Sequence, residues 1–155
     1  MSNLKIGDVA PNFTVHNQSN KTVELSQFKG KKLVIYFYPK DNTPGCTTQA
    51  CNLRDNYSDF SEKGYEILGV SADSKDRHQK FIAKQKLPFD LLADEDKTML
   101  NAYGVWGPKK FMGKEYDGIH RTTFILDENH IITNIIRKVK TKDHANQILE
   151  VKGFL

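Results

Sequence analysis

The chain has 155 residues, which predicts one domain spanning residues 1–155 with a core that needs no disulfide staples. Its ten Gly, five Pro and two Cys exclude a collagen-like repeat, a low-complexity chain and a disulfide scaffold. Its net charge of +4 comes from basic residues spread along the chain, so we expect no nucleic-acid partner.

The N-terminal segment Met1–Asp8 lacks the apolar run of a signal peptide, so we expect a cytoplasmic protein. The longest apolar run, Leu33–Tyr38, has six residues. A membrane span needs about 18, which predicts no membrane partner. In a reducing compartment a lone pair such as Cys46 and Cys51 is more typical of redox or metal chemistry than of a structural bridge.

The first half of the chain predicts two strands and a helix. Val23–Leu25 alternates between apolar and polar residues and predicts a short strand. Leu33–Tyr38 is a continuous apolar run, typical of a central strand buried on both faces. Pro39 ends this strand, and turn residues predict a loop over Lys40–Gly45. Apolar residues at helical spacing then predict a helix over Cys46–Lys63, which Gly64 ends.

The second half predicts a further strand, two helices, a β-hairpin and a closing helix. These are strand Glu66–Ser71, helix Ser74–Lys86, short helix Asp94–Tyr103, irregular segment Gly104–Gly118, strands Thr122–Leu126 and Ile131–Val139 around turn Asp127–His130, and helix Lys142–Lys152 with Phe154 available for packing. A βαβ unit followed by a hairpin predicts an α/β fold with a mixed central β-sheet flanked by helices, as in thioredoxin-like proteins.

The segment around Cys46 carries the strongest chemical signal. A buried strand leads into a turn, and the turn places Cys46 at the start of a helix. The unpaired N–H groups and the positive dipole end of a helix N-terminus favour a thiolate and bind oxyanions. Gly45 lets the backbone approach a small ligand closely, and Thr43 offers a hydroxyl three residues before the sulfur.

Cys51 follows five residues later in the same predicted helix. Helix geometry puts the Cα atoms of such a pair about 8.7 Å apart. A disulfide needs less than about 7 Å, so Cys46 and Cys51 can bridge only if the first turns unwind. Our hypothesis is that Cys51 resolves an oxidised Cys46 through local unfolding.

Other site chemistries find weaker support. Two Cys plus scattered His do not match zinc-ligand spacing, so no metal is predicted. A cysteine–histidine hydrolase needs a base oriented by a third group, and the sequence has no local signature of one. The predicted surface segments contain His16, His78, His130 and His144.

Residues near the start of the strand Thr122–Leu126 complete the candidate site. Arg121 opens this strand, and its guanidinium can stabilise a thiolate if the same end of the sheet carries Cys46. His120 precedes it, and the Gly-rich segment offers Trp106 and Phe111 as candidate walls of the site.

The spacing of Pro39, Thr43 and Cys46 resembles the active-site motif of the peroxiredoxins. The longer segment Tyr38–Cys51, with its second Cys five residues on, looks like the Q-type branch, also called bacterioferritin comigratory protein. The resemblance extends over most of the chain, through Gly7–Phe13, Tyr103–Gly107 and Gly118–Asp127.

This resemblance implies a cofactor-free thiol peroxidase with a thioredoxin fold, acting on hydrogen peroxide and organic hydroperoxides. It assigns Cys46 as the peroxidatic and Cys51 as the resolving cysteine. Thr43 corresponds to the residue that hydrogen-bonds the peroxide, Pro39 to the one that shields the site, and Arg121 to the active-site arginine. His120 departs from the family pattern, where many relatives carry an acidic residue.

The resemblance further implies that thioredoxin or a similar dithiol reduces the Cys46–Cys51 disulfide. A resolving cysteine on the same chain favours a monomer. Two alternatives remain open from the residues: a thiol–disulfide oxidoreductase acting on proteins, for which a C-x-x-C pair would be expected, and a non-enzymatic redox sensor or metallochaperone with the same fold.

Overall fold

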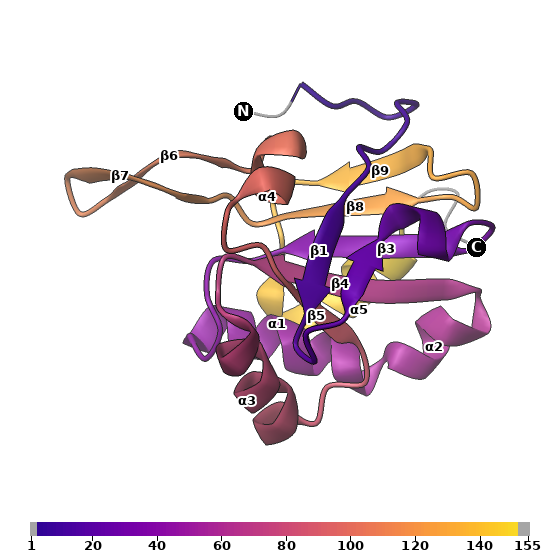
Figure 1. Ribbon diagram of the computed structural model, residues 1–155, viewed down its shortest axis with the longest axis horizontal. Coiled ribbons are helices and arrows are strands. Elements are labelled where there is room, and N and C mark those ends of the chain that lie inside the picture. The colour runs from indigo at the N-terminus through magenta and orange to yellow at the C-terminus, as the bar shows by residue number, and fades with distance from the viewer. Residues whose placement is uncertain (1–2, 152–155) are drawn as a thin grey trace.

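The computed structural model describes residues 3–151. Within them, seven strands form one sheet in the order β2-β1-β5-β4-β3-β8-β9, and β6 and β7 form a separate hairpin (Figure 1). The strands are β1 Thr14–Asn17, β2 Thr22–Glu24, β3 Lys32–Phe37, β4 Tyr65–Ser71, β5 Asp90–Ala93, β6 Trp106–Phe111, β7 Lys114–Ile119, β8 Thr122–Leu126 and β9 Ile132–Ile136. The helices are α1 Pro44–Asp55, α2 Tyr57–Glu62, α3 Lys75–Gln85, α4 Thr98–Ala102 and α5 His144–Leu149, with 3₁₀ helices at Leu25–Phe28 and Thr141–Asp143.

The large sheet combines parallel and antiparallel pairs. β3 pairs in parallel with β4, which pairs in parallel with β5. On its other edge β3 pairs antiparallel with β8, which forms a hairpin with β9. The predicted α/β class with a mixed central sheet is therefore confirmed.

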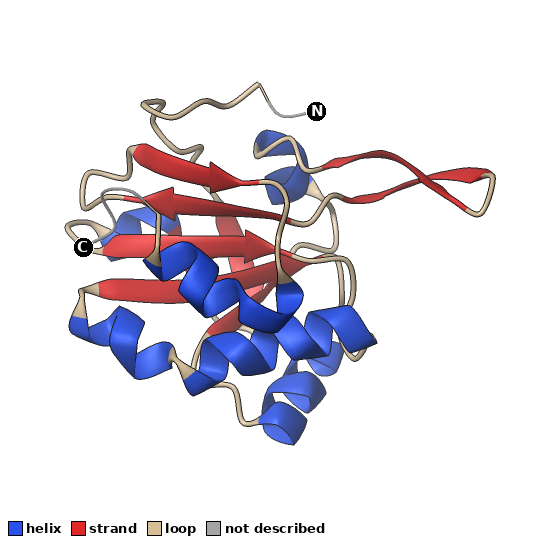
Figure 2. Cartoon of the chain, turned by 180° about the vertical axis from the view of Figure 1, so that it is seen from behind, coloured by secondary structure: helices blue, strands red, loops and turns tan. Residues whose placement is uncertain are grey.

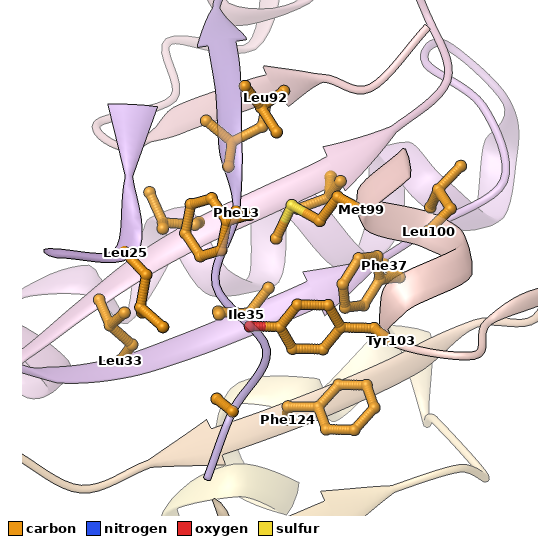
Figure 3. Packing of buried hydrophobic residues seen from close by; sticks show 14 of the residues in the cluster. Phe13, Leu25, Leu33, Ile35, Phe37, Leu92, Met99, Leu100, Tyr103 and Phe124 are labelled. Carbon is orange, nitrogen blue, oxygen red and sulfur yellow. The ribbon is translucent and has the colours of Figure 1, made fainter. Parts of the chain in front are cut away.

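Alternate residues of β3 enter two hydrophobic clusters on opposite faces of the sheet, which explains the continuous apolar run of this strand. Leu33, Ile35 and Phe37 join the cluster that α4 covers, where Phe37 packs against Tyr103 and Phe124 (Figure 3). The other face lies under α1, α2, α3 and α5, which cross it together (Figure 2). Its cluster includes Val34, Tyr36, Tyr38 and Cys46.

The predicted helix Cys46–Lys63 is wrong in its extent, because the structure divides it in two at Asn56. The amide of Asn56 donates to the Asn52 carbonyl at 2.8 Å and takes an acceptor that a continuous helix would use for a backbone N–H. The helix also begins earlier than predicted, at Pro44. Cys46 therefore lies at the third position of α1, with Thr43 as the N-cap residue.

The irregular segment predicted over Gly104–Gly118 is also wrong. It forms the β6–β7 hairpin, which projects beyond the main sheet (Figure 1). Met112 and Gly113 both have positive φ, at 52° and 80°, as a two-residue type I′ turn requires. Met is not a typical residue at the first of these positions, so the sequence did not predict the hairpin.

Several boundaries also differ from the predictions. The short strands β1 and β5 were not predicted, and α4 begins only at Thr98, because Lys97 before it has a left-handed backbone with φ of 65°. The predicted strand Ile131–Val139 is shortened to Ile132–Ile136, and the closing helix to His144–Leu149. Lys152 and Phe154, which we expected in or near that helix, lie outside the described residues.

Two of the four histidines predicted on the surface are fully buried. His78 lies between Asp41 and the Leu92 carbonyl, and His144 lies between Thr123 and Gln147. Their ring nitrogens hydrogen-bond residues that are mostly distant in the sequence, and these bonds offset the cost of burying a polar ring. Local sequence patterns do not show such partners. No helix in the part of the chain described has both the length and the apolar character that crossing a membrane requires.

Candidate active site

Cys46 lies where β3 delivers the chain to α1. Its side chain is 1% exposed, and it occupies the first turn of the helix, where backbone N–H groups have no partner within the helix. Pro44 opens the helix at a position where its missing N–H does no harm. The helix dipole therefore acts on the sulfur with its positive end.

Arg121 reaches the sulfur from the neighbouring strand. β8 runs antiparallel to β3, with Thr122 paired to Phe37, so the residue that precedes β8 lies beside the end of β3. Arg121 NH2 lies 3.4 Å from Cys46 Sγ. A guanidinium keeps its charge at every physiological pH, so it favours the thiolate over the thiol. The structure thus brings together Cys46 and Arg121, which are 75 positions apart.

Gln49 is a site residue that the sequence did not reveal. It follows Cys46 by three residues, on the same face of α1, and is fully buried. Its Oε1 accepts from Arg121 NH1 at 2.6 Å. Its Nε2 has no hydrogen-bond partner among the described residues. A polar residue on the inward face of a helix, next to a reactive cysteine, is the signal that could have identified it.

Gly45 leaves room for the guanidinium. A Cβ at this position would lie 3.4 Å from Arg121 NH2, so any side chain larger than a methyl group would displace it. Gly45 therefore acts through Arg121 as well as through the open backbone of the first helical turn.

Thr43 and Pro39 flank the site from the loop before α1. The Thr43 hydroxyl donates to the Lys40 carbonyl at 2.8 Å, which orients its oxygen and ties the loop to itself. Pro39 is partly buried and lines a groove of about 340 Å³ beside the site, together with Trp106.

The remaining aromatic and imidazole candidates are Phe111, His120 and Trp106. Phe111 is 65% exposed near the tip of the hairpin, so the expectation that it walls the site is wrong. His120 turns its ring toward the hairpin, where Nε2 hydrogen-bonds the Pro108 carbonyl at 2.9 Å. Trp106 lines the groove next to Pro39, with Lys97 Nζ 5.0 Å from its ring centroid.

A second cation adds to the positive surroundings of Cys46. Lys109 donates from Nζ to the Ile119 carbonyl at 2.8 Å. Burial lowers the pKa of Lys109, and repulsion from Arg121 lowers it further. Attraction to the Cys46 sulfur acts on the pKa of Lys109 in the opposite direction and raises it.

Cys51 lies on α1 but faces a different neighbour. Both cysteines are free thiols, and Cys51 is only partly buried. Its thiol donates to Gln85 Oε1 on α3 at 3.3 Å, whereas the Cys46 sulfur contacts Arg121. The two sulfurs thus point to separate elements while the helix is intact, as the predicted helix geometry requires.

One group of potential metal ligands occurs among the described residues. Asp41, Asp73 and His78 bring their ligand atoms within 4.8 Å of one another. Hydrogen bonds already engage these atoms, including a 2.6 Å contact between His78 Nδ1 and Asp41 Oδ2. Neither cysteine belongs to this group, so the reactive thiol does not coincide with a metal-binding arrangement.

Comparison with known proteins agrees with this geometry. The model of the AhpC/TSA family matches residues 6–135. A putative peroxiredoxin bcp of Haemophilus influenzae is 49% identical over 150 residues, covering 97% of both chains. The peroxiredoxin Bcp of Bacillus subtilis is 47% identical over 147 residues, covering 95% of this chain and 94% of the relative.

Solved structures show the same likeness. A mutant of Xylella fastidiosa PrxQ matches with a TM-score of 0.90 and 34% identity, covering 96% of this chain and 95% of that one. The bacterioferritin comigratory protein of Xanthomonas campestris, studied for alkyl peroxide reduction, matches with a TM-score of 0.85 and 36% identity over 96% and 95%. The fold is thus that of the thioredoxin-like peroxiredoxins, and the chain belongs to the AhpC/TSA family as a Q-type peroxiredoxin, a thiol-dependent peroxidase.

Proposed function

We propose that this peroxidase reduces hydrogen peroxide and organic hydroperoxides at Cys46 and resolves the product with Cys51. The observation that carries the proposal is the 3.4 Å contact between Arg121 and a sulfur at the start of α1. Two sources of positive potential meet at one thiol, and this arrangement favours a nucleophilic thiolate. The alkyl peroxide reduction named for the Xanthomonas relative supports organic hydroperoxides as substrates.

In the first step the Cys46 thiolate attacks one oxygen of the peroxide. The O–O bond breaks, the leaving oxygen takes a proton and departs as water or an alcohol, and Cys46 becomes a sulfenic acid. The N–H groups at the start of α1 and Arg121 supply donors for the charge that develops on the leaving oxygen, and the Thr43 hydroxyl adds one when it turns away from the Lys40 carbonyl. Gly45 and Pro39 keep this pocket open to a small ligand and shielded from bulk water.

In the second step Cys51 attacks the Cys46 sulfenic acid, forming a disulfide and releasing water. The intact helix directs Cys51 toward Gln85, so this step requires α1 to unwind at its first turns. The positions of the two sulfurs on one short helix support an intramolecular bond in preference to a bond between two chains.

In the third step an external dithiol reduces the disulfide by thiol–disulfide exchange. We propose thioredoxin or a similar protein as this reductant, acting on a cytoplasmic monomer whose single domain spans residues 1–155. The two hydrophobic clusters pack on opposite faces of the same seven-stranded sheet, which supports a single domain. The chemistry resides in the two sulfurs, so the proposal requires no metal and no organic cofactor.

The deciding experiment is the intact mass and the thiol count after one equivalent of hydrogen peroxide. The wild-type protein should lose both thiols and about 2 Da as the disulfide forms. Cys51→Ser should gain about 16 Da as a sulfenic acid, and Cys46→Ser should remain unchanged. Two unreacted thiols in the wild-type protein, or full turnover by Cys46→Ser, would overturn the proposal.

A further inference from the structure

A buried histidine–aspartate pair joins α3 to the loop that carries the candidate site. His78 Nδ1 and Asp41 Oδ2 are 2.6 Å apart, and both side chains are fully buried. The Tyr38 hydroxyl donates to the other carboxylate oxygen of Asp41 at 2.6 Å. His78 Nε2 lies 2.9 Å from the Leu92 carbonyl on β5. None of the steps above uses these groups.

The contacts fix how the protons of this cluster are arranged. A carbonyl only accepts, so His78 Nε2 must carry a proton to bond the Leu92 oxygen. Burial, and then the charge of Asp41, raise the pKa of Tyr38 well above its usual range, so its hydroxyl keeps its proton and donates. His78 Nδ1 then faces Asp41 Oδ2 across the 2.6 Å contact.

Two side chains also hold the backbone of Asp41. Its N–H donates to Asp73 Oδ2 at 2.7 Å, and its carbonyl accepts from Arg77 at 3.4 Å. The next residue, Asn42, has a left-handed backbone with φ of 63°. Asp41 is therefore held by side chains from α3 and from the loop before it, and the chain turns sharply toward α1 directly after it.

The position of this anchor matters for both proposed chemical steps. Asp41 lies between Pro39 and Thr43 in the loop that leads to Cys46. The peroxide step needs Thr43 and the first helical turn in a fixed geometry, and the resolving step needs the same turn to unwind. An anchor just before Asn42 holds the loop in place while leaving the helix after it able to open.

A buried ion pair contributes little net stability compared with apolar residues of the same size. The short hydrogen bond of this pair forms only when the Asp41 and His78 side chains take one relative position. This favours a role in geometry over a role in stability.

We propose that Asp41 and His78 are positioning residues of the peroxide step, which hold the loop Lys40–Thr43 so that its donors meet the peroxide bound at Cys46. The inference rests on the proposed role of Cys46. It assigns a task in the reaction to a cluster that touches neither the sulfur nor the substrate.

The test uses the Cys51→Ser protein as the parent, so that Cys46 alone reacts. Two rate constants are measured in each variant: oxidation by hydrogen peroxide in a single turnover, and alkylation by iodoacetamide. Oxidation needs the loop donors, whereas alkylation needs only an accessible thiolate. Thermal unfolding monitors the fold.

We expect Asp41→Ala and His78→Ala to slow oxidation about 10- to 100-fold, because a small displacement of the loop donors lowers the rate constant of oxidation steeply. Alkylation should change less than about threefold, because it does not use the loop donors. Asp41→Asn should stay within about threefold of the parent in both reactions, since its amide can donate to neutral His78 while its oxygen accepts from Tyr38. Tyr38→Phe, which keeps the packing, should slow oxidation about threefold or more through loss of one bond to Asp41.

Met99→Ala is the matched control, because it opens a cavity in the cluster on the opposite face of the sheet. It should lower stability without altering either rate constant. The inference is overturned if Tyr38→Phe and the alanine variants oxidise like the parent, or if both rate constants fall together in proportion to stability. Failure of the parent to react with peroxide would instead overturn the proposed function itself.

Discussion

Arg121 makes two contacts that have to be considered together. One arm of its guanidinium approaches Cys46 Sγ at 3.4 Å, and the other donates to Gln49 Oε1 at 2.6 Å. The short contact to a fully buried amide limits the rotation of a long side chain that would otherwise sample several rotamers. Gln49 therefore determines where the positive charge lies relative to the sulfur.

Replacing Gln49 should weaken the reaction of Cys46 with peroxide. Gln49→Ala removes the acceptor of Arg121, and a hydrogen bond to a charged group contributes about 1.5–3 kcal/mol. We expect the second-order rate constant with hydrogen peroxide to fall about 10-fold, as a loss of about 1.4 kcal/mol of transition-state stabilisation implies. Stopped-flow oxidation of the Cys51→Ser protein measures it.

Gln49→Glu is the matched control for this prediction. Its carboxylate keeps an acceptor for Arg121 and removes the buried amide nitrogen that has no partner among the described residues. This variant keeps the bond to the guanidinium but adds a negative charge near the sulfur, so its rate constant should lie between those of the parent and of Gln49→Ala. Equal rates in all three proteins would show that Gln49 does not position Arg121.

The sequence could predict the motif residues of the site but not the residues that support them. Cys46, Thr43 and Pro39 lie on one short stretch, so their spacing was informative. Gln49 and Asp41 act through partners that are 72 and 37 positions away, Arg121 and His78. No local pattern shows such pairs, because they exist only once β8 and α3 have packed against the loop and α1.

At the scale of elements, the two ends of α1 are attached differently. The C-terminal half is tied to its neighbours through Asn52, which accepts from the Ala145 N–H and donates to the Lys142 carbonyl, and through Arg54, which donates to the Gln85 carbonyl at 2.6 Å. The side-chain bonds of the N-terminal half converge on Arg121. Unwinding from the N-terminus therefore breaks fewer side-chain hydrogen bonds, so we expect Cys46 to be the cysteine that moves.

Changing the helix propensity of α1 should change the rate of the resolving step. Thr48 is exposed in the second turn, between the two cysteines. Ala favours a helix over Gly by about 1 kcal/mol, so disulfide formation should be about fivefold slower in Thr48→Ala than in Thr48→Gly. The wild-type protein should fall between them. The decay of the sulfenic acid, followed by dimedone trapping after a pulse of peroxide, measures the rate.

The first step provides the control for this comparison. Both Thr48 variants should form the sulfenic acid at the wild-type rate, because Thr48 makes no contact with Cys46 that the structure records. Disulfide formation that is equally fast in the two variants would contradict resolution through unwinding of α1.

Among the elements, those with a clear period were predicted and those defined by tertiary contacts were not. β3 contains the apolar run Leu33–Phe37 and β8 the apolar run Phe124–Leu126, and both runs are buried, so their existence followed from the sequence. The strands β1 and β5 have four residues each and are held by pairing with neighbouring strands, so no periodicity was long enough to detect them. The β6–β7 hairpin has mostly exposed positions and therefore no apolar alternation.

At the scale of the molecule, helices on one face bury groups that would otherwise titrate near neutrality. His144, at the start of α5, is fully buried, and its ring bonds the Thr123 hydroxyl and Gln147 Oε1, each at 2.8 Å. The amide oxygen of Gln147 only accepts, so Nδ1 carries the proton and Nε2 accepts from Thr123. The folded protein thus holds His144 in its neutral form.

His144 should make the free energy of unfolding decrease on acidification. Burial lowers the pKa of His144 from 6.5 to about 4, with a smaller opposing effect from the bond to Gln147. The unfolded chain then takes up a proton before the folded one, so this stabilisation is complete above about pH 6.5 and is lost as the pH falls toward 4. The loss amounts to about 3 kcal/mol. Urea unfolding at pH 7 and pH 4.5 measures how much the free energy of unfolding falls between these two pH values. This fall should be about 2–3 kcal/mol smaller in His144→Asn than in the wild-type protein. An equal fall in both proteins would mean that His144 is protonated in the folded state.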